Sequence, residues 1–181
     1  MNIANFILFQ TAWFVTIFSA ASDKPYIGVL FTILWMLFHL SVVASKRKSE
    51  LMLIASAVLI AAIFESTLLI SGFISYPEHA VLFTLVPLWM ITLWINLALT
   101  INHSMSWLKG RYVLSASLAA IAGPLTYAAG ERFDAIILHG MPSLIAISII
   151  WLFAMPLLFW LSHLLTNINL VNSRLVVNRT E

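Results

Sequence analysis

Long apolar stretches, each about as long as a bilayer-spanning helix, alternate along the chain with short polar breaks. The stretches cover residues 3–21, 26–44, 51–70, 81–101, 112–129 and 142–165. A helix needs about 20 residues to cross about 30 Å of hydrocarbon, so each stretch predicts one transmembrane helix. The pattern therefore predicts an all-α fold: a polytopic membrane bundle of six transmembrane helices over residues 1–165, followed by a polar cytoplasmic tail over residues 166–181.

The fourth stretch carries a narrow polar stripe. We expect one long helix over residues 89–107, in which polar and amphipathic side chains recur every three or four residues: Trp89, Thr92, Asn96, Thr100, His103 and Trp107. At about 100° per residue these side chains lie within roughly 80° of arc. Apolar residues cover the remaining surface, which indicates a helix inside lipid with its stripe turned toward other helices.

Composition excludes several classes of protein. Hydrophobic residues make up 62% of the 181 residues and charged residues only 9%, whereas a soluble domain carries about 25% charged residues. Cysteine is absent, which excludes disulfides, thiol nucleophiles and thiolate metal sites. The longest basic run is Lys46-Arg47-Lys48, and nothing in the chain indicates a nucleic-acid partner.

The basic residues are distributed unevenly between the two sides of the expected membrane. Six helices place both termini on one side, together with seven Lys and Arg residues: Lys46, Arg47, Lys48, Lys109, Arg111, Arg174 and Arg179. The other side holds only Lys24 and Arg132. The positive-inside rule therefore predicts that both termini are cytoplasmic.

Glu65 is the one acidic residue inside a predicted span, roughly 8 Å from the outer end of its helix at about 1.5 Å per residue. A carboxylate at that depth costs several kcal/mol unless it is paired, hydrated or protonated. Two interpretations remain open. Glu65 is a functional group that faces a cavity, or it is a hydrogen-bonded residue that fixes helix packing.

Gln10, His39 and Asn96 lie at similar depths toward the cytoplasmic side, so they could form one polar layer. Hydrogen bonds among them would hold the bundle together, each contributing about 1 kcal/mol or less. His39 and Glu65 are roughly 13 Å apart along the membrane normal by helix rise, so we do not pair them. The histidines are scattered and none has the spacing of a metal-binding helix. We therefore expect no metal site and no cofactor.

The fifth stretch combines small residues with a proline. Ser115, Ala119 and Gly123 recur at steps of four, which lets helix backbones approach closely. Gly123-Pro124 then predicts an interruption of the helix, with Tyr127 four residues after Gly123. Pro87 and Pro156 predict similar breaks, and the resulting kinks could open an interior cavity. The alternative is that prolines are simply common in membrane helices.

Several motifs resemble the domain of unknown function 2878 family of uncharacterised bacterial inner-membrane proteins. They are spread over residues 5–165: Phe9-Gln10-Thr11-Ala12-Trp13-Phe14, the position of His39, Glu50-Leu51, Pro87-Leu88-Trp89-Met90, Leu93-Trp94, Ser106-Trp107-Leu108 and Ala122-Gly123-Pro124-Leu125-Thr126-Tyr127-Ala128-Ala129-Gly130. The last motif is the most specific. The resemblance implies that aspartate is more common than glutamate at position 65, so Glu65 is a departure from the family pattern. The family brings no established activity or catalytic residues, and the frequent proximity of its genes to fatty-acid-modifying genes implies a lipid-linked role.

These features predict a multi-pass protein of a bacterial inner membrane with a buried polar site. Its candidate residues are Glu65, His39, Gln10, Trp89, Asn96 and Tyr127. The leading hypothesis is a lipid-linked accessory or lipid-handling protein, with membrane lipid as its partner. Three alternatives stay open: a proton-coupled transporter of small molecules, a membrane enzyme that uses Glu65 with His39 or Tyr127 on lipid, and a structural subunit of a membrane-protein partner. No strong catalytic constellation is present, so the balance is against an enzyme.

Overall fold

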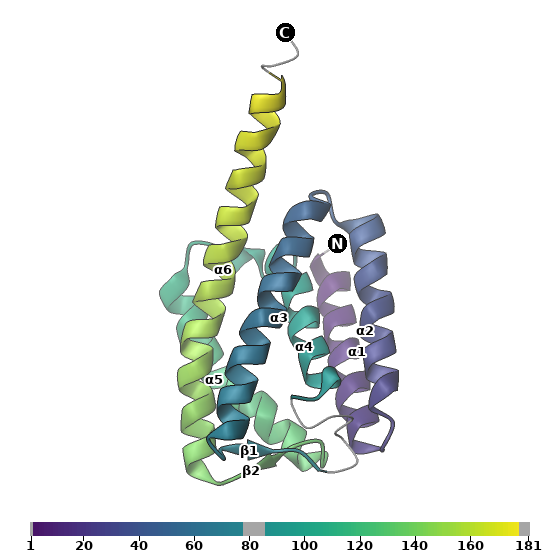
Figure 1. Ribbon diagram of the computed structural model, residues 1–181, viewed down its shortest axis with the longest axis vertical. Coiled ribbons are helices and arrows are strands. Elements are labelled where there is room, and N and C mark those ends of the chain that lie inside the picture. The colour runs from purple at the N-terminus through teal and green to yellow at the C-terminus, as the bar shows by residue number, and fades with distance from the viewer. Residues whose placement is uncertain (1, 78–85, 178–181) are drawn as a thin grey trace.

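Six α-helices run up and down through the part of the chain that the computed structural model describes, residues 2–77 and 86–177 (Figure 1). Their bounds are α1 Asn2–Ala21, α2 Pro25–Phe38, α3 Arg47–Ile70, α4 Leu88–Ile101, α5 Tyr112–Arg132 and α6 Met141–Val177. A π-helical turn, η1 (His39–Val43), extends α2, and a 3-10 turn, η3 (Ser106–Leu108), follows α4. The prediction of an all-α bundle is confirmed.

Five of these helices are long and apolar enough to cross a membrane: α1, α2 with η1, α3, α5 and α6. Their outward faces are apolar, as Leu59, Ile63, Val113 and Ile121 show with exposed fractions above 60%. Such faces are stable against lipid and costly against water. The fourth helix, expected over residues 81–101, begins only at Leu88, after an extended Pro87. Residues 78–85 lie outside the described residues. The 14 residues of α4 cover about 21 Å.

The expected single helix over residues 89–107 is wrong, because α4 ends at Ile101. Two backbone N–H groups, those of His103 and Met105, donate to the carbonyl oxygen of Thr100 and turn the chain back. Side chains of the same turn then bond to other helices. Asn102 and His103 reach Glu50 on α3, and Ser104 bonds to Asn5 on α1. These tertiary contacts outweigh the apolar periodicity that favours a longer helix.

The prolines also differ from expectation. Pro87 precedes the first residue of α4, where its missing N–H removes no helical bond. The helices α5 and α6 continue through Pro124 and Pro156, so Gly123-Pro124 does not end a helix. The helix α6 also extends to Val177 and takes in most of the segment expected to be a polar tail, residues 166–181.

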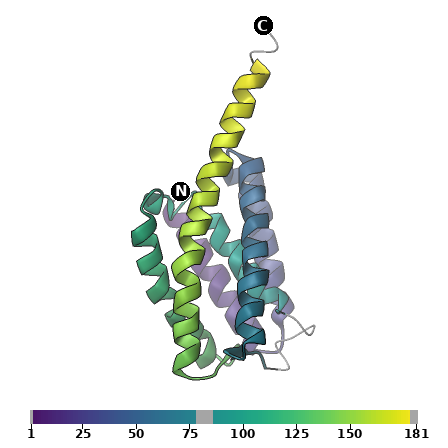
Figure 2. The same cartoon turned by 60° about the vertical axis from the view of Figure 1, so that its left-hand side comes forward.

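The helix α4 lies at the centre of the bundle. The helix α4 packs against α1, α2, α3 and α6, whereas α5 packs on α6 and α1 packs on α2 (Figure 2). Its polar stripe is buried at Trp89, Thr92, Asn96 and Thr100. The opposite surface is buried as well, since Leu97, Leu99 and Ile101 have little or no exposure. The fourth helix is therefore buried both along its polar stripe and on the opposite surface.

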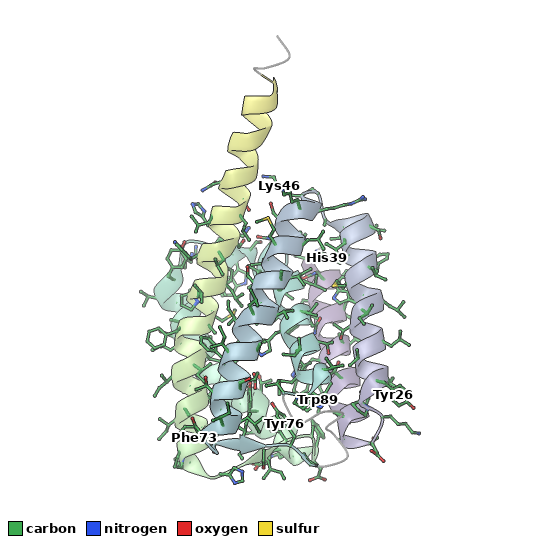
Figure 3. The ribbon with its side chains drawn as sticks, in the orientation of Figure 1. Tyr26, His39, Lys46, Phe73, Tyr76 and Trp89 are labelled. Atoms are coloured by element: carbon green, nitrogen blue, oxygen red, sulfur yellow. The ribbon has the colours of Figure 1, made fainter. Side chains whose placement is uncertain are left out.

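The two ends of the bundle differ. The chain begins and ends on one side, where the loop with Lys46 joins α2 to α3 (Figures 1 and 3). At the other end, strands β1 (Ile74–Ser75) and β2 (Ile137–Leu138) form a small antiparallel pair. This pair, which the sequence patterns did not predict, joins the loop after α3 to the loop after α5. It therefore closes the end of the bundle nearest to Glu65.

Candidate functional site

Glu65 lies on α3 with no exposed surface and accepts hydrogen bonds from three aromatic residues. The Trp94 indole N–H donates to Oε1 over 2.9 Å, and the Tyr127 hydroxyl donates to the same oxygen. The Tyr76 hydroxyl donates to Oε2 over a longer 3.4 Å. The donors come from α4, α5 and the segment after β1, so the carboxyl group links parts of the chain that are far apart in sequence.

The surroundings of Glu65 provide donors without a balancing cation. Within the described residues, no Lys, Arg or His forms an ion pair with it. Burial raises the pKa of Tyr76, and the charge of Glu65 and the hydrogen bond to it raise that pKa further. The Tyr76 phenol therefore keeps its proton and remains a donor. We call Glu65, Tyr76, Trp94 and Tyr127 the Glu65 cluster.

Aromatic rings surround this cluster. Trp89 is 1% exposed and meets the Tyr76 ring edge to face, with centroids 5.7 Å apart (Figure 3). The Trp94 ring stacks on Trp151 of α6, with centroids 4.9 Å apart and planes 17° from parallel. Such ring pairs restrict the rotamers of the donors that reach Glu65. The structure thus gives the cluster a fixed geometry.

A cavity of about 800 Å³ lies between α1 and α5, with α4 as its floor and with Trp151 and Met155 of α6 in its wall. Three aromatic residues that lie in or beside the cluster form part of its wall: Trp89, Trp94 and Tyr127. The rim includes Phe14 of α1 and Leu125 of α5, which are exposed on the apolar outer surface. The cavity therefore opens sideways toward lipid, and Glu65 lies behind the donors at its wall.

The remaining candidate residues do not form the expected polar layer. Gln10 lines the cavity, and the Asn96 amide donates to the Phe9 carbonyl oxygen over 2.9 Å. His39 instead lies beside Glu50 and His103 at the other end of the bundle. The described hydrogen bonds do not join Gln10, His39 and Asn96 to one another, because helix rotation directs them to different neighbours.

Sequence reasoning missed four residues that the structure places in these polar groups: Tyr76, Trp94, Glu50 and His103. An indole N–H buried in hydrocarbon needs a hydrogen-bond acceptor, and a lone buried carboxyl group needs donors. These two requirements are the signal in the sequence that could have predicted the hydrogen bond between Trp94 and Glu65. The third apolar stretch begins at residue 51, so the sequence pattern places Glu50 in the preceding loop. Since α3 begins at Arg47, Glu50 lies one turn inside it.

A family model described as "Protein of unknown function (DUF2878)" matches residues 2–157 of the chain. No curated protein and no solved structure matches the chain. Because the match spans most of the helical bundle, it includes the Glu65 cluster, the cavity and the polar groups at the other end.

Proposed function

The chain belongs to the DUF2878 family of unknown function, and we propose that it is a bacterial inner-membrane protein that binds and handles a membrane lipid. The observation that supports this proposal is the apolar cavity between α1 and α5, which opens on the lipid-facing surface and reaches the Glu65 cluster. In this proposal an acyl chain enters sideways from the bilayer and lies over α4.

The lining of the cavity matches an acyl chain better than a polar solute. Most of it is aromatic or aliphatic, as Phe9, Ile17, Met90, Leu93 and Leu97 illustrate. A polar solute there would leave hydrogen-bonding groups unpaired at a cost of several kcal/mol each. The volume lies within the range of about 300–1,000 Å³ that ligand pockets occupy. Size and chemistry therefore both favour a lipid.

The Glu65 cluster gives the cavity a polar end. The hydroxyl of Tyr127 and the indole N–H of Trp94 lie at the wall and are oriented by Glu65. A hydroxyl group of a lipid could donate to the phenol oxygen of Tyr127, which can accept a hydrogen bond while its own O–H still donates to Glu65. This arrangement would position a lipid by its polar atoms while the apolar lining holds its chain. The cluster contains no evident nucleophile, so the proposal stops at binding and handling.

Photo-crosslinking of a lipid into the cavity tests the proposal. The purified protein is placed in vesicles of phosphatidylethanolamine and phosphatidylglycerol that carry a diazirine on the acyl chain. We expect crosslinks on the buried lining residues Met90, Trp94 and Leu97, in addition to those on the outer surface. Peptide mass spectrometry locates each crosslink.

A matched pair of variants on α5 provides the control. Ala122→Phe adds a ring at the cavity, whereas Ile121→Phe adds one on the exposed surface next to it. We expect Ala122→Phe to reduce the interior crosslinks about tenfold, which equals about 1.4 kcal/mol of binding free energy, and Ile121→Phe to leave them unchanged. Crosslinks confined to the outer surface of the wild-type protein would contradict lipid binding in the cavity.

A further inference from the structure

A second polar cluster lies at the end of the bundle that carries the chain termini, away from Glu65. It consists of His39 at the start of η1, Glu50 in the first turn of α3 and His103 in the turn after α4. One ligand atom from each of these residues lies within 4.8 Å of the others. Figure 3 shows His39 near that end and Tyr76 near the opposite end. We call these three residues the His39 cluster.

The ligand atoms of the His39 cluster are close enough together to surround a single ion. His103 Nε2 is 3.2 Å from Glu50 Oε1, and His39 Nε2 is 3.9 Å from Glu50 Oε2. The two imidazole rings are perpendicular, with centroids 4.5 Å apart. Ligands about 2.0–2.2 Å from a zinc ion are separated from one another by about 3–3.5 Å. Small side-chain movements would therefore bring all three ligand atoms to one ion.

Several polar atoms of the His39 cluster are buried without a hydrogen-bond partner. His39 has no exposed surface and Glu50 is 5% exposed. Both ring nitrogens of His39 and the Oε2 oxygen of Glu50 are buried without a hydrogen-bond partner. A buried polar atom left unpaired costs about 1–3 kcal/mol, and such atoms are rare in folded proteins. Two of these atoms, His39 Nε2 and Glu50 Oε2, lie 3.9 Å apart, so one ligand between them could pair with both and complete the site.

We propose that His39, Glu50 and His103 bind a divalent transition-metal ion, with Zn²⁺ as the reference ion. Two imidazoles and one carboxylate are a donor set that suits Zn²⁺ and Fe²⁺. Three protein ligands leave at least one coordination position for water or another ligand. The spacing of the histidines in the sequence suggested that they were too scattered to share a metal ion. In the fold, His39, Glu50 and His103 meet because the ends of three separate helices lie together.

Neighbouring residues hold the carboxylate in place. The Asn102 side-chain amide donates to Glu50 Oε1 over 3.1 Å, and the Ser162 hydroxyl of α6 donates to the Oδ1 oxygen of the same amide. Hydrogen bonds of this kind orient metal-ligating carboxylates, and their removal typically costs about 10–100-fold in metal affinity. Ser104 and Met105, directly after His103, line the lipid cavity. The turn after α4 thus connects the proposed metal site to the cavity.

Calorimetry with Zn²⁺ on the full chain, purified without a histidine tag and stripped of metal, tests the inference. We expect one Zn²⁺ per chain, and we expect Co²⁺ to give visible absorption bands from nitrogen and oxygen ligands. His103→Gln should weaken Zn²⁺ binding at least about 100-fold, and Asn102→Ala about tenfold. Since His39 is fully buried, its substitution can disturb folding. The decision therefore rests on His103, whose side chain is 15% exposed.

Histidines outside the cluster provide the controls. His139 and His163 are hydrogen-bonded to Ser75 and Asn167, and His79 lies outside the described residues. The single variants His79→Gln, His139→Gln and His163→Gln should bind Zn²⁺ like the wild-type chain. Absence of stoichiometric binding, or binding that survives His103→Gln and is lost in a control variant, would overturn the inference. Neither outcome affects the lipid crosslinks, so the two proposals fail independently.

Discussion

Glu65 shows how a single acidic residue can be accommodated inside an apolar bundle. Two donors share its Oε1 oxygen, and a third approaches Oε2. Each donor side chain is aromatic, so it adds apolar surface to the core and contributes one polar atom to the carboxyl group. The carboxyl group is consequently both a packing element and an acidic group beside the cavity. A substitution must separate these two roles.

Glu65→Gln makes that separation. The amide keeps a carbonyl oxygen for Trp94 and Tyr127 and places its NH₂ group toward the Tyr76 hydroxyl, so packing is retained while the acid is lost. If lipid handling needs the acid, a strain lacking the protein should lose a defined lipid species that returns with wild type and not with Glu65→Gln. Lipid mass spectrometry makes the comparison, with Glu131→Gln as the control. Full rescue by Glu65→Gln would assign Glu65 to packing alone.

At the scale of elements, the contact between α5 and α6 depends on one glycine. A Cβ atom at Gly123 would lie 2.4 Å from the ring of Trp151, the residue that stacks on Trp94. Gly123→Ala should therefore displace Trp151 and destabilise the protein by about 1–3 kcal/mol. Thermal unfolding in detergent measures this effect.

Gly130→Ala on the same helix is the matched comparison. Its Cβ atom would meet the Cγ2 methyl group of Ile136 at 3.3 Å and the Cδ1 methyl group of Ile17 at an ordinary 3.8 Å. The 3.3 Å contact asks Ile136 to shift by only a few tenths of an ångström, whereas the 2.4 Å contact at Gly123 is a full overlap, so we expect a much smaller loss of stability. Equal losses in Gly123→Ala and Gly130→Ala would show that helix α5 itself, and not its contact with Trp151, is sensitive to the added methyl group.

The elements were more predictable than their contacts. Apolar length predicted the helices, because each must satisfy its backbone within one segment in lipid. The lone charge of Glu65 and the position of Tyr127 indicated a polar interior. The turn after Ile101 and the His39 cluster were not predictable, because both arise from side chains that meet only after the helices have packed. Periodicity along one helix contains no information about such contacts between helices.

At the scale of the whole molecule, the distribution of basic residues follows the two ends of the bundle. Lys46, Arg47 and Lys48 lie at the end where the chain begins and terminates, and Lys24 lies at the other. The positive-inside rule then predicts that the His39 cluster lies near the cytoplasm and the Glu65 cluster near the opposite surface. The orientation thus determines from which side a metal ion would reach its proposed site.

The absence of cysteine from the chain allows a direct test of this orientation. Ser22→Cys and Ser45→Cys introduce single thiols at exposed serines in the loops at opposite ends of the bundle. Each replaces an oxygen with a sulfur and changes no charge. We expect a membrane-impermeant maleimide to label Ser22→Cys in intact spheroplasts, and to label Ser45→Cys only after lysis. The reverse labelling pattern would show that the orientation in the membrane is the opposite one. The proposed metal site would then lie on the outer side, and its metal would come from outside the cell.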